Sequence, residues 1–193
     1  MKTIITTLFI LFSFISFSQD SIVEYYNEIA GKSEYDDYNN TFYKWKGDVK
    51  IFFDFENSDS LKEYTKPIIK DLNDLIDPIN ILIVDNKSDA NVFLYFCDFS
   101  EFKKKCFVNV NGNFLGFVCS TKYQSRIYNS YIFINEKLSG IELKSVLREE
   151  ITQSLGFSND SWKYPNSIFY QGGNNENKFS ELDKEIIKLH YNN

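Results

Sequence analysis

Histidine is nearly absent from this sequence of 193 residues, since only His190 is present. Zinc in catalytic sites is held mainly by imidazole groups, so a site built from several histidines is excluded for this chain. Basic residues are also in the minority: 21 Lys and Arg face 27 Asp and Glu, which leaves a net charge of −6. Nucleic-acid interfaces need basic surfaces, so this balance argues against a nucleic-acid partner.

Long hydrophobic runs are missing after the first 20 residues. The apolar stretch at positions 4–17 follows Lys2 and ends among the small residues Ser16 and Ser18. A membrane anchor would need about 20 apolar residues, so the shorter stretch favours a cleaved secretory signal peptide. We therefore predict a signal peptide at 1–18, a single domain at 19–193 without a membrane span, and a periplasmic or extracellular location.

Cysteine is scarce as well, with Cys97, Cys106 and Cys119 all in the exported part. An oxidising compartment permits one disulfide and leaves one thiol, and the spacings match no zinc motif. A two-residue turn at Asn111-Gly112 would keep Cys106 and Cys119 apart, whereas a four-residue turn would place them opposite each other. The pairing stays open on the sequence alone.

Apolar periodicity and turn residues predict alternating strands and helices. Helices are expected at 21–30, 60–76, 143–155 and 180–191, with Pro67 kinking or restarting the second. Strands are expected at 48–55, 79–84, 91–97 and 127–135, with a strand-turn-strand unit at 107–118. Residues 101–105 read as a charged connector and 161–178 as an irregular segment. This order indicates an α/β or α+β layered fold, and we expect an α+β arrangement with a mixed twisted sheet.

The helix at 143–155 is the most informative element. Its apolar face is formed by Leu143, Val146, Leu147, Ile151 and Leu155, and Gly156 is placed to end it. Glu150 and Ser154 project inside this apolar arc, while Glu149 and Gln153 share a stripe at its edge. An unpaired buried charge is costly, so Glu150 must be paired, protonated or used in chemistry.

The layout of residues 49–191 resembles the zincin fold, and especially the metzincin metallopeptidases with their HExxHxxGxxH motif. With Gly156 on the motif glycine, residues 149–153 (EEITQ) take the HExxH positions and Asn159 takes the third histidine. The segment of Ser167, Ile168, Phe169 and Tyr170 resembles the Met-turn, with Phe169 replacing methionine. The helix with REE, TQ and LG and the later SIFY also resemble a group of exported bacterial proteins with a domain of unknown function.

The departures from this motif bear on function. The resemblance implies Glu150 as the general base, but the three metal positions are Glu149, Gln153 and Asn159. Amide oxygens suit calcium or magnesium better than zinc, and one carboxylate with two amides is a weak ligand set. We expect no cofactor: zinc is disfavoured, and calcium or magnesium is the weaker alternative.

The sequence therefore predicts an exported zincin-like protein whose zinc site has been lost. Its expected role is non-catalytic, either structural or in binding a protein, peptide or glycan ligand. The alternative is a metal-dependent hydrolase, a peptidase that uses Glu150 as its general base. The purely structural interpretation of Glu150 is a buried acid that is hydrogen-bonded to neighbouring polar groups. The corresponding structural interpretation of Glu149, Gln153 and Asn159 is a hydrogen-bonded cluster.

Overall fold

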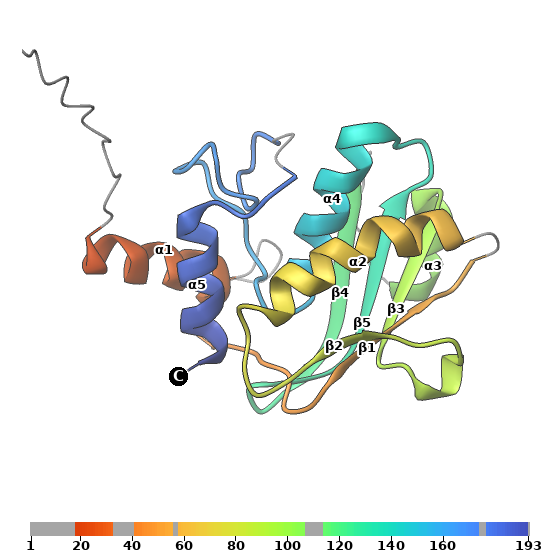
Figure 1. Cartoon of the computed structure of the whole chain (residues 1–193), viewed down its shortest axis with the longest axis horizontal. Helices are drawn as coiled ribbons and strands as arrows, with labels where there is room; N and C mark the ends of the chain where they lie inside the picture. Colours follow the sequence, from red (N-terminus) through yellow and green to blue (C-terminus); the bar gives the residue numbers. More distant parts are fainter. Residues whose placement is uncertain (1–17, 33–40, 56–57, 107–113, 174–176, 193) are drawn as a thin grey trace, which may run out of the picture.

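Five strands form one mixed sheet with helices on both faces (Figure 1). The structure is a computed structural model that describes residues 18–32, 41–55, 58–106, 114–173 and 177–192. The helices are α1 (Gln19–Gly31), α2 (Asp59–Asn73), α3 (Phe99–Cys106), α4 (Gly140–Gln153) and α5 (Glu181–Tyr191), with a 3-10 turn η1 (Lys87–Asp89). The strands are β1 (Val49–Phe53), β2 (Ile81–Ile83), β3 (Val92–Cys97), β4 (Gly116–Tyr123) and β5 (Arg126–Asn135).

The strand order is β2-β1-β3-β5-β4, and the first four strands run parallel. β4 is antiparallel to β5 and forms one edge of the sheet, with Phe117 opposite Phe133. The hairpin between them turns at Gln124 and Ser125, whose φ angles of 48° and 59° are both left-handed. Two such residues in succession give the turn twist that a tight antiparallel hairpin favours. The sheet therefore ends in one strand of reversed direction.

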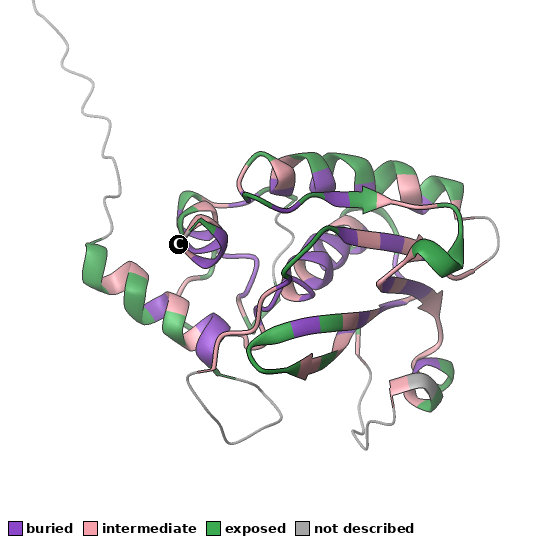
Figure 2. Ribbon diagram, turned by 90° about the horizontal axis from the view of Figure 1, so that it is seen from below, coloured by how far each residue is buried: buried purple, intermediate pink, exposed green. Residues whose placement is uncertain are grey.

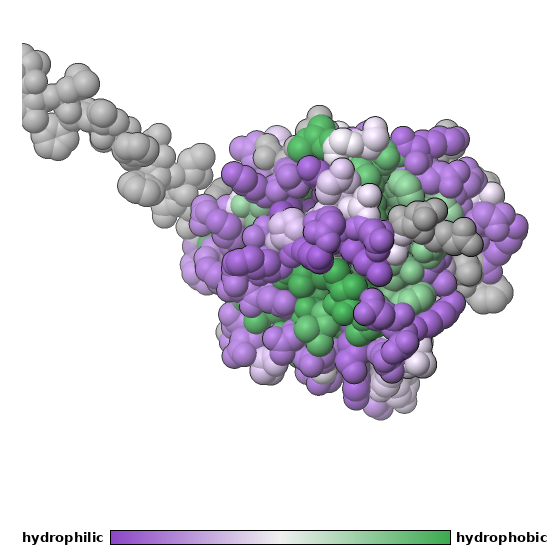
Figure 3. All heavy atoms as spheres, turned by 45° about the vertical axis from the view of Figure 1, so that its right-hand side comes forward, coloured by the Kyte–Doolittle hydropathy of each residue, from purple (hydrophilic) through white to green (hydrophobic). Residues whose placement is uncertain are grey.

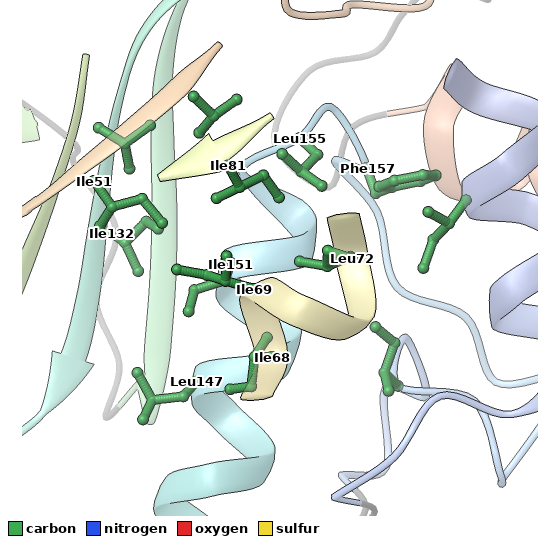
Figure 4. Packing of buried hydrophobic residues seen from close by; sticks show 14 of the residues in the cluster. Ile51, Ile68, Ile69, Leu72, Ile81, Ile132, Leu147, Ile151, Leu155 and Phe157 are labelled. Atoms are coloured by element: carbon green, nitrogen blue, oxygen red, sulfur yellow. The ribbon is translucent and has the colours of Figure 1, made fainter. Parts of the chain in front are cut away.

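The two faces of the sheet carry separate hydrophobic clusters. On one face, Ile51 and Ile132 of the sheet meet α2 and α4 side chains such as Ile68 and Ile151 (Figure 4). On the other face, Phe102 of α3 packs with strand aromatics, including Phe133 at a ring-centroid distance of 5.2 Å. The helix sides toward the sheet are buried and the outer sides are exposed (Figure 2). The face shown in Figure 3 is largely hydrophilic, with a hydrophobic area near its centre.

α1 and α5 pack together beyond the sheet (Figure 1). Ser180 caps α5 in a capping box with Asp183. Ser18 caps α1 and accepts a hydrogen bond from the backbone N–H of Ser21. The pair supports the irregular segment that follows α4.

The expected layered α+β class and the mixed sheet are confirmed. Two local predictions were wrong. Residues 101–105 are not a connector, because they belong to α3, and no second helix begins at Pro67, because α2 continues through it. β4 pairs with β5, the strand that follows it. Residues 107–113 of the expected strand-turn-strand unit, including the turn at Asn111-Gly112, lie outside the described residues.

The disulfide joins Cys106 to Cys119, with the Cα atoms 6.3 Å apart. Cys106 ends α3 and Cys119 lies in β4, so the bridge links a helix to the edge strand and not two paired strands. Cys97, in β3, keeps its thiol. No helix in the described ranges is both long and apolar enough to cross a membrane.

Candidate functional site

A cleft of about 680 Å³ lies between α4 and the edge strand β4. Its walls come from both elements and from the irregular segment after α4, and they include Gly116, Val118, Ser120, Lys122, Glu142, Val146, Glu149, Glu150, Gln153, Asp160 and Tyr170. A cavity of this size matches known sites for small ligands or a few peptide residues. The helix singled out by sequence therefore forms one wall of a cleft.

Glu150 lies in this cleft although it sits inside the apolar arc of α4. It is only 6% exposed, as its position on the helix predicts. Its side chain is placed directly against the backbone of Gly116 in β4, because a Cβ added at Gly116 would lie 2.5 Å from Cγ and 2.6 Å from Cδ of Glu150. A glycine at this point of β4 lets the strand and the helix approach closely enough to enclose the carboxylate.

Alanine at Gly116 should disturb the cleft and lower stability. The added methyl group must displace Glu150, so we expect the free energy of unfolding to fall by about 1–3 kcal/mol. Gly47→Ala is the matched control, because nothing lies within 4 Å of a Cβ at Gly47. Urea unfolding of both variants, and of Gly116→Ala combined with Glu150→Ala, measures the coupling. An equal loss from Gly116→Ala with and without Glu150 would contradict this account.

The structure brings together two of the three predicted metal positions. Glu149 and Gln153 line the cleft, and the Gln153 Nε2 donates a 2.8 Å hydrogen bond to Asp160 Oδ1. Asn159 turns toward α1 instead, where its Nδ2 donates to the backbone oxygen of Glu28 at 3.2 Å. Asp160, which follows Asn159, takes the place in the cleft that the motif assigns to the third ligand.

These side chains do not fit a zinc ion. Gln153 supplies a neutral amide whose nitrogen is already bonded to Asp160, and Asn159 is directed elsewhere. Zinc sites use imidazole, thiolate or carboxylate ligands, and Glu149 is the one such group among the three motif positions. Within the described parts of the chain, no three His, Cys, Asp or Glu side chains are grouped to hold a metal ion.

The Met-turn-like segment is held by a buried carboxylate. Ser167 Oγ donates to Asp183 Oδ1 at 2.6 Å, and the backbone N–H of Ile168 donates to Asp183 Oδ2 at 3.3 Å. Tyr25 of α1 in turn donates its hydroxyl proton to Ser167 Oγ at 2.9 Å. Burial raises the pKa of Asp183, while these hydrogen bonds act in the opposite direction. Asp183 thus ties α1 and α5 to the segment beneath the cleft.

Phe169 and Tyr170, which follow in this segment, connect the hydrogen-bond network of Asp183 to the cleft. Phe169, in the position of the Met-turn methionine, is fully buried and lies 5.2 Å from the Phe157 ring. Tyr170 lines the cleft, and its ring has Trp162 edge-on at 5.7 Å. The segment therefore supplies packing under the site and one aromatic side chain within it.

His190 lies outside the cleft and is fully buried. Its Nδ1 accepts a hydrogen bond from the Tyr26 hydroxyl at 3.0 Å, and its Nε2 faces the backbone oxygen of Tyr43 at 3.2 Å. Because a carbonyl can only accept, Nε2 carries the proton of a neutral ring. Burial lowers the pKa of His190 to about 3. The ring is therefore neutral and has a structural role.

The charged side chains that line the cleft are mostly negative. Four carboxylates line it, from Glu142, Glu149, Glu150 and Asp160, against the ammonium group of Lys122. Lys122 Nζ donates to Ser158 Oγ at 2.7 Å and lies 5.1 Å from the centre of the Tyr43 ring. With these groups ionised, the lining carries three net negative charges.

Sequence reasoning missed Asp160, Lys122 and Gly116. The isolated glycine at 116 in an apolar run was a usable signal of close backbone approach. Nothing in the sequence distinguishes Asp160 from Asn159, because the loop after Gly156 decides which of them faces the cleft. Lys122 was missed because the predicted strand ended at Val118, whereas β4 continues to Tyr123.

The fold and cleft define this chain as an α+β protein with a mixed five-stranded sheet and an acidic cleft at the sheet edge. It belongs to the family described as Protein of unknown function (DUF2927), whose model matches residues 19–193. No protein with a curated description matches the chain.

Two solved structures of myroilysin are similar to this chain. The first is 10% identical with a TM-score of 0.48 and covers 77% of this chain and 82% of its own. The second, a crystal structure, is 11% identical with a TM-score of 0.49 and covers 85% of this chain and 94% of its own.

Proposed function

We propose that this chain is an exported protein that binds a ligand in the cleft between α4 and β4 without cleaving it. The observation that carries the proposal is the arrangement of the motif positions. A cleft is present between α4 and β4, but Gln153 is hydrogen-bonded to Asp160 and Asn159 is turned toward α1. The signal-like start of the sequence and the Cys106–Cys119 disulfide support export to an oxidising compartment.

The edge strand supports binding of an extended segment. The backbone N–H of Asn135 in β5 donates to the oxygen of Leu115 at 2.9 Å, which sets the phase of the ladder. By the antiparallel register, Phe117 directs its backbone groups toward β5, whereas Gly116 and Val118 direct theirs away, along the cleft. An extended polypeptide can add to such an edge through main-chain hydrogen bonds.

Catalysis needs more than the carboxylate of Glu150. In a zincin the metal lowers the pKa of its bound water and stabilises the developing charge, and the glutamate only accepts the proton. In this chain the three metal positions hold one carboxylate, Glu149, and two amides, and one of these amides faces away from the cleft. Glu150 on its own is a weak base for ordinary water, so binding is the function that this geometry supports best.

The second candidate is a peptidase that uses Glu150 as general base with an oxygen-ligated metal. Its support is the position of Glu150, which lines the cleft next to the edge strand. The two candidates predict different behaviour toward calcium, magnesium and peptides, so they can be separated directly.

Incubation with a peptide library should give no cleavage products above a protein-free blank, with or without zinc, calcium or magnesium. Calorimetric titration of the wild-type protein with each ion should show no stoichiometric binding that is lost in Glu149→Gln. Mass spectrometry of the library compares wild type with Glu150→Gln. Metal-dependent products from wild type that Glu150→Gln abolishes would overturn the proposal and establish the peptidase.

A further inference from the structure

We propose that the ligand of this cleft is a cationic extended polypeptide with lysine or arginine at alternate positions. This inference rests on the proposed function and adds the chemistry of what is bound. Three features carry it: the acidic wall formed by α4, the direction of the β4 backbone, and the aromatic side chains at the segment after α4.

The acidic wall runs along one side of α4. Glu142 and Glu149 are seven residues apart, about two helical turns, so they lie on the same side of α4, and Glu150 lines the cleft beside them. At about 1.5 Å per residue, Glu142 and Glu149 are roughly 10 Å apart along the helix axis. Charge of one sign along the walls of a cleft concentrates ligands of the opposite sign. The wall therefore selects several positive charges spread along a ligand, not one.

The strand wall sets the spacing of those charges. A segment added beside Gly116 and Val118 would continue the sheet, so its side chains would point alternately toward α4 and toward the opposite face. Residues facing α4 then recur at about 6.8 Å, twice the rise of an antiparallel strand. Lysines at every second position of the segment can therefore all reach the acidic wall. In a run of consecutive lysines, every second side chain would point to the sheet face opposite α4.

The aromatic side chains are a separate observation that favours a cation. Tyr170 lines the cleft, and beside it Trp162 is 70% exposed, although large apolar rings are usually covered. The faces of such rings attract lysine and arginine side chains. Gly172 lets the chain pass close to the Tyr170 ring, since a Cβ there would lie 2.5 Å from Cε1. Aromatic faces next to carboxylates suit an ammonium or guanidinium group.

Fluorescence anisotropy with three labelled hexapeptides tests the inference. The probes alternate lysine with serine, or place three lysines before three serines, or alternate glutamate with serine. We expect the alternating lysine peptide to bind about tenfold more tightly than the block peptide, a difference of about 1.4 kcal/mol, and to weaken as salt rises. The glutamate peptide should not bind.

Variants locate the binding. Glu142→Gln with Glu149→Gln should weaken the alternating peptide about tenfold or more. The matched control is Glu181→Gln with Glu185→Gln on α5, outside the cleft lining, which should leave binding unchanged. Circular dichroism confirms that each variant is folded.

Each other result has a defined meaning. Equal binding of the block and alternating lysine peptides would overturn the strand-matched pattern. Binding of the glutamate peptide but not of the lysine peptides would overturn the cationic class and leave the proposed function standing. Cleavage of the lysine peptide, lost in Glu150→Gln, would instead overturn the proposed function. An equal effect of the α5 control variant would show that general charge, not the cleft, is responsible.

Discussion

Asp183→Ala should lower the free energy of unfolding by about 3–5 kcal/mol, the range expected when a buried, fully bonded carboxylate is removed. Asp183 is 0% exposed and accepts hydrogen bonds from the Ser167 hydroxyl and the Ile168 backbone. It also accepts from the backbone N–H of Ser180 at 2.8 Å, which completes the cap of α5. Alanine would leave these donors buried beside a cavity, so both the cap and the segment under the cleft are weakened.

The measurement is urea unfolding of Asp183→Ala, Asp183→Asn and Glu181→Ala. Asparagine keeps one acceptor oxygen and should give an intermediate loss. Glu181 lies in the same first turn of α5 but is exposed and pairs with Lys184, so its removal should cost far less than that of Asp183. If Asp183→Ala were within 1 kcal/mol of wild type by that assay, the buried network would not have the role described.

The same substitution should also weaken the cleft. Ser167 to Tyr170 form one short segment, and Tyr170 lines the cleft while Ser167 is anchored to Asp183. The Met-turn resemblance drew attention to this segment, but it did not show what holds the segment in place. The anchor is Asp183, the third residue of helix α5, which begins 14 residues after Ser167.

The part of the fold that the sequence predicts best is α4. Its apolar periodicity located the helix, and Gly156 has a φ of +120°, a backbone conformation that side chains rarely adopt. The periodicity also placed Glu150 correctly inside the apolar arc. Such local signals depend on the 3.6-residue repeat and on glycine, which act within a few residues.

The missed features depend on contacts between distant segments. The hairpin between β4 and β5 turns at Gln124 and Ser125, which are not the residues that usually mark such a turn, so its strands were not paired from sequence. Asn159 faces α1 because its backbone N–H donates to Ile29 and its side chain to Glu28. No local pattern encodes that α1 lies there, and so the motif alignment assigned Asn159 to the site in place of Asp160.

The single histidine should make the protein sensitive to acid. His190 has a pKa of about 3 in the fold against its ordinary value of 6.5, so the unfolded chain binds a proton that the folded chain does not. Its contribution to stability is complete above pH 6.5 and is lost as the pH falls toward 3. At pH 4.5 the loss amounts to about 2–3 kcal/mol, and the slope between is about 1.4 kcal/mol per pH unit.

The cause is the closed environment of the ring. Phe157 lies 4.6 Å away and Tyr191 5.0 Å away, and the nearby Lys44 further disfavours a positive charge. Tyr26 and the oxygen of Tyr43 satisfy the neutral ring. Protonation would place a hydrogen on Nδ1 facing the Tyr26 hydroxyl, which would have to turn its own proton away. The folded state therefore resists protonation until it opens.

The measurement compares wild type with His190→Gln by urea unfolding between pH 7.5 and 4. Glutamine can donate and accept but does not titrate, so it should be less stable at pH 7.5 and lose less stability on acidification. Carboxylates contribute equally to both proteins, including Asp183, whose raised pKa acts in the opposite direction as the pH falls. The difference between the two slopes thus isolates one proton at His190, and parallel pH profiles would show that the ring takes up that proton without unfolding.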